Sequence, residues 1–252
     1  MAGNANPLSP AGTACGGEVI DPSRLWYNAH SLARMNKESY FTRENIAAEA
    51  MAMAGQLPVN RRTAPFCPAK AALLVIDMQR FFLSPDSHAF LPAAPAIVPN
   101  IVALTAAFTR SQRPVVFTRH ANTPGNAGRM AAWWRELPMR GHPLAAIDAS
   151  LPATEPAVVE KSQYDAFYQT DLEERLRGAG VEQVVVSGVA THLCCETTAR
   201  SAFVRGFAVF VVIDGTATWN RERHVSSLRA MAHGCAVPLR AADLQTALAG
   251  KP

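Results

Sequence analysis

The chain has 252 residues, of which 49% are hydrophobic and 17% are charged, and its formal net charge is +4. This length and composition fit one large α/β domain with an appendage better than two domains of equal size. Because the basic residues form no cluster of five or more, we expect no nucleic-acid partner. No apolar run approaches the ~18 residues of a membrane span. The N-terminus lacks the cationic and apolar regions of a secretory signal, so we expect no membrane association.

The chain contains five cysteines and no CxxC pair. An odd number of thinly spread cysteines argues against a disulfide framework or a zinc site. We therefore expect reduced thiols in a cytoplasmic protein. The cysteines are Cys15, Cys67, Cys194, Cys195 and Cys235.

The first quarter of the chain differs from the rest. Residues 1–22 are rich in Gly, Ala, Pro and Asn and predict a flexible leader. Thr42 is a suitable N-cap for an Ala- and Met-rich helix over residues 43–56. Residues 1–66, the leader and this helical arm, are too short for a core of their own. We expect the arm to pack on the main domain or on another subunit of a homo-oligomer, or to cover a site.

From residue 67 to residue 252, short apolar runs alternate with amphipathic segments. Apolar strands separated by single helices predict a parallel sheet that is covered on both faces. Strands are predicted at residues 71–76, 115–118, 157–159, 184–187, 208–213 and 236–238, and helices at 97–111, 171–176, 195–204 and 221–232.

Polar side chains follow these predicted strands. In open α/β sheets, ligands bind outside the carboxyl ends of the strands, so an acid, a base and a thiol are expected to converge there. Cys194 also opens a helical segment, where the helix dipole is expected to lower the pKa of a thiol. The strand-end residues are Asp77, Arg119, His120, Lys161, Cys194 and Asp214.

Three of these residues form a possible catalytic set. Asp77 can accept the proton of the Cys194 thiol, and Lys161 can hold both groups in place. Thiolate attack on an amide carbonyl forms an oxyanion, which the backbone amides of Ala190 and Cys194 are placed to stabilise. Taken singly, the same residues also fit a strand-end cap, a surface lysine and a small buried cysteine pair.

Further residues are candidates for the walls of a substrate pocket. Trp133 and Trp134 are adjacent, so they point in different directions and at least one of them is expected to have a packing role. His192 is expected to shape the turn that contains the cysteine rather than to transfer a proton. The candidate substrate-binding residues are Phe82, Arg119, His120, Trp133, Trp134, Tyr164 and Phe167.

Three segments resemble the signature segments of the isochorismatase-like cysteine hydrolases. They are Asp77-Met78-Gln79, residues 160–167 (EKSQYDAF) and residues 188–194 (GVATHLC), and the resemblance covers residues 69–240. It implies a Rossmann-like three-layer α/β/α fold, with a mostly parallel sheet of about six strands, for a hydrolase domain over residues 67–252. It also implies an Asp77, Lys161 and Cys194 triad, and a cis peptide between Val189 and Ala190 that would turn the Ala190 amide into the oxyanion hole.

Departures from the family pattern narrow the expected activity. Isochorismatases usually carry glycine at the position of Cys194, so the cysteine favours hydrolysis of a C–N bond in a small amide, carbamoyl, ureido or lactam compound. The Asp-x-His metal motif of nicotinamidases is missing from residues 119–122, so we expect no catalytic metal and no cofactor. Asp165 stands where the family often has serine, and a second carboxylate near Lys161 would repel an acidic substrate or pair with a cationic one.

Two other functions fit part of the pattern. One is isochorismatase-type hydrolysis of a vinyl ether, in which Asp77 acts without the thiol. The other is a non-enzymatic binding protein in which the vicinal Cys194 and Cys195 sense redox state through a labile disulfide.

Overall fold

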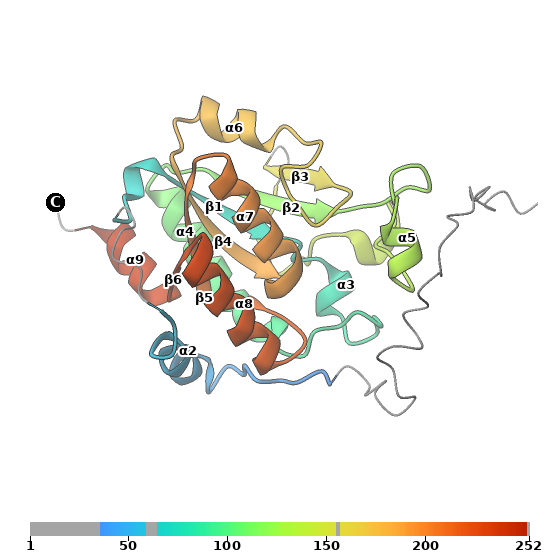
Figure 1. Ribbon diagram of the computed structural model, residues 1–252, viewed down its shortest axis with the longest axis horizontal. Helices are drawn as coiled ribbons and strands as arrows, with labels where there is room; N and C mark the ends of the chain where they lie inside the picture. Colours follow the sequence, from blue (N-terminus) through green and yellow to red (C-terminus); the bar gives the residue numbers. More distant parts are fainter. Residues whose placement is uncertain (1–35, 59–64, 155–156, 251–252) are drawn as a thin grey trace, which may run out of the picture. The chain divides into compact units, whose positions relative to one another are not determined.

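Six parallel strands form one sheet, as the apolar runs predict (Figure 1). The computed structural model describes residues 36–58, 65–154 and 157–250. The predicted strand over residues 71–76 is confirmed to the residue. The strands are β1 (Ala71–Ile76), β2 (Val115–His120), β3 (Val158–Lys161), β4 (Gln183–Val189), β5 (Ala208–Ala217) and β6 (Val237–Leu239).

The strand order creates a crevice at the carboxyl end of the sheet. It runs β3-β2-β1-β4-β5-β6, so the chain builds outward from β1 to β3 and then returns to place β4 on the other side of β1. Connections leave neighbouring strands β1 and β4 toward opposite sides at this reversal. Ligands in such sheets bind at this switch point, so the residues that follow β1 and β4 are candidates for a ligand site.

Helices cover both faces of the sheet and confirm the predicted three layers. α4 (Ala94–Arg110) packs against α9 (Ala241–Ala249) and against β1, β4 and β5. α7 (Glu196–Val204) and α8 (Arg221–Gly234) pack together and cross in front of the strands in Figure 1. The sequence pattern predicts α4, α6, α7 and α8 to within a few residues, but not α3, α5 or α9. The helices are α2 (Ile46–Ala54), α3 (Arg80–Leu83), α4 (Ala94–Arg110), α5 (Met130–Trp133), α6 (Leu172–Gly178), α7 (Glu196–Val204), α8 (Arg221–Gly234) and α9 (Ala241–Ala249), with short turns η1 (Pro68–Lys70), η2 (Pro143–Ala145) and η3 (Thr191–Cys195).

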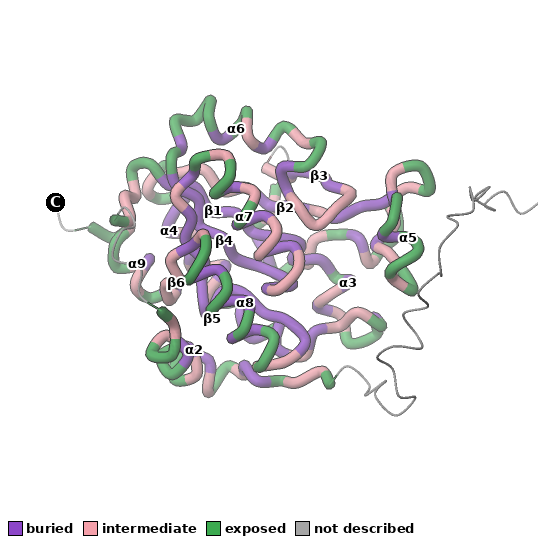
Figure 2. Tube along the Cα trace, viewed as in Figure 1, coloured by how far each residue is buried: buried purple, intermediate pink, exposed green. Residues whose placement is uncertain are grey.

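The core lies in the central strands. Every residue of β1 and β4 is buried, because helices cover the sheet on both sides. Figure 2 shows this buried centre surrounded by helices whose outer faces are exposed. Among the described residues, no helix is long and apolar enough to cross a membrane.

The described part of the arm packs on this core. Tyr40, Phe41 and Met53 belong to the same buried cluster as the sheet, so one of the expected arrangements, packing on the main domain, is confirmed. α2 begins after Asn45 rather than after Thr42, and the two residues exchange hydrogen bonds of 2.7 and 3.3 Å between side chain and backbone. The predicted leader, residues 1–22, lies outside the described residues. The boundary at residue 66 and the homo-oligomer stay predictions.

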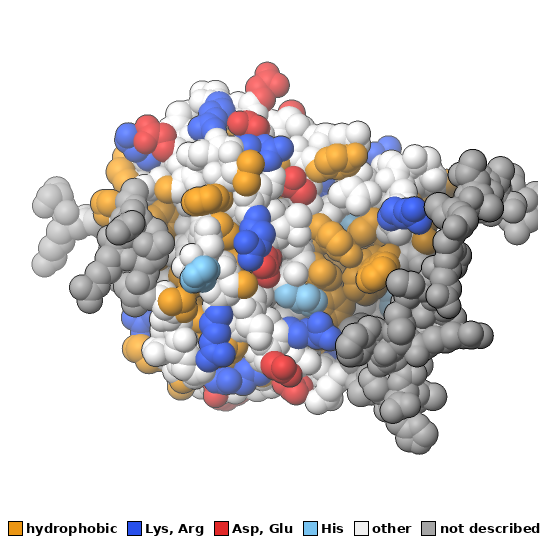
Figure 3. Space-filling model, viewed as in Figure 1, with side chains coloured by type: hydrophobic (Ala, Val, Ile, Leu, Met, Phe, Trp, Pro, Cys, Tyr) orange, Lys and Arg blue, Asp and Glu red, His pale blue; other side chains and the backbone are white. Residues whose placement is uncertain are grey.

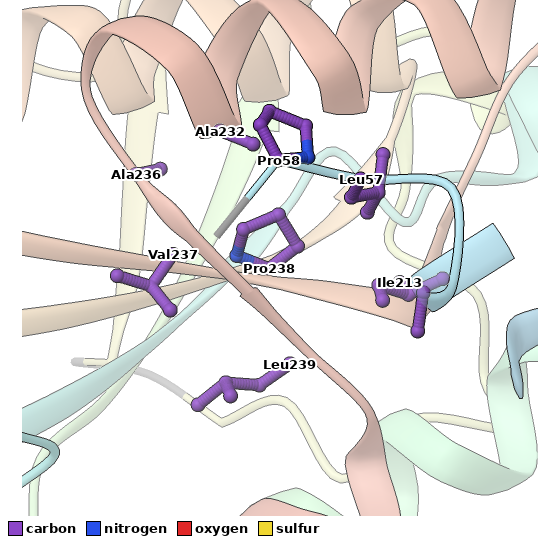
Figure 4. A pocket seen from close by; sticks show the side chains of 9 residues that line it. Leu57, Pro58, Ile213, Ala232, Ala236, Val237, Pro238 and Leu239 are labelled. Carbon is purple, nitrogen blue, oxygen red and sulfur yellow. The ribbon is translucent and has the colours of Figure 1, made fainter. Parts of the chain in front are cut away.

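The end of the arm lies beside the edge strand β6. An apolar cavity of about 220 Å³ remains between them, lined by Leu57, Pro58, Ile213, Pro238 and Leu239 among others (Figure 4). None of the strand-end residues that the sequence brings together lines this cavity. The candidate site is therefore a different feature, at the carboxyl ends of the strands.

Gly188 lets β4 approach β1 closely, just before the candidate site. Its φ is +106°, and a Cβ there would lie 2.0 Å from the carbonyl oxygen of Ile76, the residue before Asp77. We expect Gly188→Ala to lower the free energy of unfolding by more than 3 kcal/mol, roughly the sum of backbone and overlap costs. Urea unfolding would measure this loss.

Gly180 supplies the matched control, because its φ is also positive, at +67°, but open space surrounds it. We expect Gly180→Ala to cost only about 1–2 kcal/mol, the price of a left-handed backbone with a side chain. Equal losses in Gly188→Ala and Gly180→Ala would contradict the close approach of the two strands.

Candidate active site

A buried ion pair lies at the centre of the strand ends. Lys161 Nζ, at the end of β3, is 2.7 Å from Asp77 Oδ2, directly after β1, and both side chains are fully buried. Lys161 also donates to the carbonyl oxygen of Gln163 at 2.8 Å. Burial favours the neutral amine, but the charge of Asp77 and its contact with Nζ outweigh burial, and the pKa of Lys161 is raised. Lys161 is therefore an ammonium at neutral pH.

Cys194 lies beside this ion pair. It belongs to η3, a π-helical turn that joins β4 to α7, and π-turns inside helical segments often occur at functional sites. Its Sγ lies within 4.8 Å of an Asp77 carboxylate oxygen and a His120 ring nitrogen. The Lys161 ammonium lies close enough to favour the thiolate form of this sulfur. The structure thus brings together the three residues of the predicted triad.

The thiol is protonated in this resting arrangement. Burial raises the pKa of Cys194 well above its usual range; Lys161 opposes this rise and Asp77 adds to it. The expectation of a lowered pKa is therefore wrong, because desolvation of a fully buried thiolate outweighs the helix dipole and the ammonium. The proton of Cys194 has to leave as the sulfur attacks, and Asp77 is within reach to take it.

Two polar residues that the sequence analysis did not single out position this group. Thr118 Oγ1 donates to Asp77 Oδ1 at 2.6 Å and accepts from the Asp77 backbone N–H at 3.0 Å. Gln79 binds the backbone N–H and carbonyl oxygen of His120, both at 2.9 Å. Thr118 could have been predicted from strand alternation, because it lies two residues before His120 and therefore on the same face of β2.

His120 lies next to the triad as a neutral imidazole. Burial and the Lys161 charge lower the pKa of His120 to about 4, although Asp77 opposes them. Its Nε2 is 2.8 Å from Asn122 Oδ1, and Asn122 donates its amide N–H to the carbonyl oxygen of Ser162. The asparagine therefore presents an acceptor, so Nε2 carries the proton and Nδ1 keeps a lone pair.

The turn that contains Cys194 is held from α8. His224 Nε2 donates to the carbonyl oxygen of Ile213 at 3.2 Å, so its Nδ1 accepts from the Thr191 hydroxyl at 2.9 Å. Ser227 Oγ is 3.3 Å from the Thr191 carbonyl oxygen and 2.6 Å from Glu196 Oε2. The peptide bond between Val189 and Ala190 is cis, as the family resemblance implies.

A group of aromatic rings contacts the π-turn that contains Cys194. Trp134 Nε1 donates to the Tyr164 hydroxyl at 2.6 Å, and the Trp134 ring stacks on Trp219 with centroids 6.1 Å apart. His192 meets Trp219 edge-on at 4.8 Å. Figure 3 shows hydrophobic side chains gathered around α3 at this edge of the sheet, with histidines beside them. Trp219 was not predicted, because β5 extends four residues beyond the expected end at Ile213.

The other predicted residues make contacts of their own. Arg119 pairs with Glu160 at 3.3 Å, in register with it on the strand face opposite His120 and Lys161. Trp133 is 78% exposed, whereas Phe167 is buried and stacks on Phe207. Phe82 is half-buried and meets the ring of Phe81 edge-on.

Two carboxylates that the sequence placed near the site serve local structure instead. Asp165 accepts from the Phe167 N–H at 2.8 Å and from Ser201 Oγ at 2.7 Å, so its charge is held by the loop and by α7. Asp214 lies inside β5, not after it, and accepts from the Ala241 N–H at 2.7 Å at the start of α9.

A family model described as the isochorismatase domain matches residues 71–243. The chain belongs to the isochorismatase family. The expected family is thereby confirmed, and with it a hydrolase that acts on small molecules.

Relatives within the isochorismatase family differ in activity. Nicotinamidase 3 of Arabidopsis thaliana is 40% identical over 185 residues, 71% of this chain and 89% of that protein. Enterobactin synthase component B of Escherichia coli strain K12 is 30% identical over 190 residues, 74% of this chain and 66% of that protein. The crystal structure of a cysteine hydrolase from Pseudomonas syringae pv. phaseolicola 1448A superposes with a TM-score of 0.71 at 26% identity, over 76% of this chain and 97% of that one.

Asp77, His120 and Cys194 each offer one potential metal ligand, and these atoms lie within 4.8 Å of one another. Both Asp77 oxygens are engaged, however, one by Thr118 and one by the Lys161 ammonium at 2.7 Å. A divalent cation would have to displace this buried positive charge. The donor set therefore does not fit a resident metal ion, and it fits proton transfer between Asp77 and Cys194.

Three histidines with lowered pKa values make stability dependent on pH. Burial lowers the pKa of His120 and His192 to about 4 and that of His224 to about 3, against 6.5 in an unfolded chain. Below pH 6.5 the unfolded chain binds protons that the folded chain does not. We therefore expect the contribution of these histidines to the free energy of unfolding to be complete above pH 6.5. The free energy of unfolding, measured in urea, should fall steadily from there toward pH 4.

His224→Gln is the matched variant for this pH dependence, since glutamine keeps a donor and an acceptor but does not titrate. We expect its unfolding to take up about one proton fewer than the wild type near pH 5. An unchanged slope of stability against pH would contradict the assignment of His224 as a buried neutral imidazole.

Proposed function

We propose that the chain is a metal-independent cysteine hydrolase that cleaves a C–N bond of a small amide, carbamoyl, ureido or lactam compound. One observation carries the proposal. The Cys194 thiol lies beside a fully buried ion pair of Asp77 and Lys161, with a carboxylate oxygen within 4.8 Å of the sulfur. An acid that can accept a thiol proton and a cation that holds it in place are the parts that nucleophilic catalysis needs.

The reaction proceeds through a thioester. Asp77 removes the proton from Cys194 as the sulfur attacks the carbonyl carbon, and the C=O electron pair moves to oxygen. The protonated Asp77 then gives its proton to the leaving nitrogen as the C–N bond breaks. Water attacks the thioester next, with Asp77 as the base again, and releases the acid and the free thiol.

The oxyanion that forms in each step needs N–H donors, and we assign them to the backbone amides of Ala190 and Cys194. Support comes from the tightness of the turn that carries them. The Ala190 carbonyl oxygen accepts from the N–H groups of Leu193 at 3.0 Å and Cys195 at 3.3 Å. His224 and Ser227 anchor Thr191 from α8. A turn held at several points keeps donors in place without reorganisation.

The substrate contacts that we propose come from His120 and from three aromatic residues, Trp134, Tyr164 and Trp219, which we call the aromatic wall. Trp134, Tyr164 and Trp219 form a group of flat rings next to the π-turn that contains Cys194, which suits a planar carboxamide. His120, with an unprotonated Nδ1, suits an N–H of the reacting group. Nicotinamide is the first compound to test, since Nicotinamidase 3 is 40% identical.

Hydrolysis of a vinyl ether is the second candidate. It is favoured by the match to the isochorismatase domain and by Asp77, whose carboxyl group, once protonated, can protonate an ether without a thiol. A redox pair is less well supported, because the two thiols face different partners: Cys195 Sγ contacts the Ser187 carbonyl oxygen at 3.9 Å, whereas Cys194 faces Asp77 and Lys161.

Trapping of the thioester tests the proposal. Wild-type protein is mixed with nicotinamide, an N-carbamoyl amino acid, a small lactam or isochorismate, quenched in acid within milliseconds and analysed by mass spectrometry. We expect the acyl group of one C–N substrate on the peptide that contains Cys194. Turnover of isochorismate alone, with no adduct, would favour ether hydrolysis and overturn the thioester route.

A further inference from the structure

A short segment before α2, Lys37–Phe41, binds the part of the chain that follows β5. We call this segment the strap. The Glu38 N–H donates to the carbonyl oxygen of Trp219 at 2.8 Å, and the Tyr40 hydroxyl accepts from the Thr218 N–H at 3.0 Å. The strap lies outside residues 71–243, which match the family model.

The strap also holds a second segment near the site. Lys37 Nζ donates to the carbonyl oxygens of His88 at 2.6 Å and Phe90 at 2.8 Å, in the loop between α3 and α4. Glu38 accepts from the Arg221 N–H at 3.1 Å, at the start of α8. One stretch of five residues thus contacts residues 88–90 and residues 218–221, which are far apart in sequence.

Thr218 and Trp219, which the strap binds, make contacts with residues of the candidate active site. Thr218 Oγ1 is 2.6 Å from Nδ1 of His192, which lies in the same π-turn as Cys194. The Trp219 ring stacks on Trp134 and meets His192 edge-on. Tyr40 also packs on His224 with ring centroids 5.3 Å apart. A shift of Thr218 and Trp219 would therefore move the Trp219 ring against Trp134.

We propose that the strap determines how tightly substrate binds, and that Tyr40 is its main positioning residue. Tyr40 is 8% exposed and Thr218 is fully buried, so loss of the Tyr40 hydroxyl leaves a buried N–H without its acceptor. The Thr218–Trp219 backbone then moves to find another partner. The strap does not contact Asp77 or Lys161 through any described hydrogen bond or ion pair, so the chemistry is affected less than binding. The inference rests on the proposed function in placing substrate against Trp219.

Tyr40→Phe tests the proposal, with Met53→Ala as the matched control. Met53 is buried in α2, outside the strap, and its truncation lowers stability without touching Trp219. Protein is labelled with 5-fluorotryptophan, and the Trp219 resonance is assigned with Trp219→Phe. We expect Tyr40→Phe to shift the Trp219 resonance and to raise KM for nicotinamide, or for whichever amide is turned over, about tenfold with kcat within threefold.

Lys37→Met is a second variant that removes the contacts with the loop between α3 and α4 and leaves the buried core untouched. We expect it to raise KM in the same direction. An unmoved Trp219 resonance in Tyr40→Phe, or an equal rise of KM in Met53→Ala, would overturn the proposal. The fluorine signal needs no substrate, so failure of the proposed hydrolysis and failure of the strap remain separate results.

Discussion

Replacement of Cys194 by alanine is expected to lower kcat/KM for C–N hydrolysis by about 10⁴-fold or more, since nucleophile removal costs a comparable factor in other covalent hydrolases. Cys194 is 4% exposed, and its Sγ lies within 4.8 Å of an Asp77 carboxylate oxygen. Alanine removes the sulfur and leaves Asp77 and Lys161 in contact. The loss is therefore one of chemistry, and the free energy of unfolding should change by less than about 2 kcal/mol. Steady-state kinetics and urea unfolding measure the two quantities.

Cys195→Ala is the control for this variant, because it removes a neighbouring thiol of the same size. Cys195 Sγ contacts the Ser187 carbonyl oxygen and not the triad. We expect its kcat/KM to stay within about tenfold of the wild type, since only packing changes. Full activity in Cys194→Ala would contradict the covalent mechanism. Equal losses of kcat/KM in the two variants would mean that Cys194 and Cys195 act together, and would contradict Cys194 as the single nucleophile.

Much of the fold follows from the sequence, because buried parallel strands have few alternative explanations. β1 was predicted to the residue, since six consecutive apolar residues are buried on both faces. β5 was predicted to end at Ile213, because polar residues follow it. These residues remain in the strand: Asp214 receives the Ala241 N–H, and Thr216 donates to the carbonyl oxygen of Val212 at 3.0 Å. Polar groups with local partners inside a buried strand cannot be recognised from composition.

That misplaced strand end explains what the sequence missed in the site. The true end of β5 carries Thr218 and Trp219, which hold His192 and face Trp134. The convergence of Asp77, Lys161 and Cys194 was predictable, because parallel strands end at one edge. The orientation of side chains was not, and Arg119 consequently lies on the strand face opposite His120. The raised pKa of Cys194 depends on burial by distant segments, which no local pattern reports.

Removal of the Lys161 charge is expected to damage both stability and activity. In Lys161→Met, a methionine of similar length fills the space but leaves the Asp77 carboxylate buried without a cation. We expect the free energy of unfolding to fall by about 3–5 kcal/mol, the usual cost of breaking a buried ion pair from one side. We also expect kcat to fall by about 10³-fold or more, since Asp77 would take up a proton and could no longer serve as the base.

The double variant Asp77→Asn with Lys161→Met separates these two effects. It removes both charges, and replacement of a whole buried pair by neutral groups is often close to neutral for stability. We therefore expect the double variant to recover most of the stability lost in Lys161→Met, while its activity stays as low, because the proton acceptor is gone. Urea unfolding of the wild type, both single variants and the double variant completes a thermodynamic cycle for the pair. Additive losses of stability would mean that the 2.7 Å contact between Lys161 and Asp77 carries no coupling, and recovery of activity in the double variant would remove Asp77 from the mechanism.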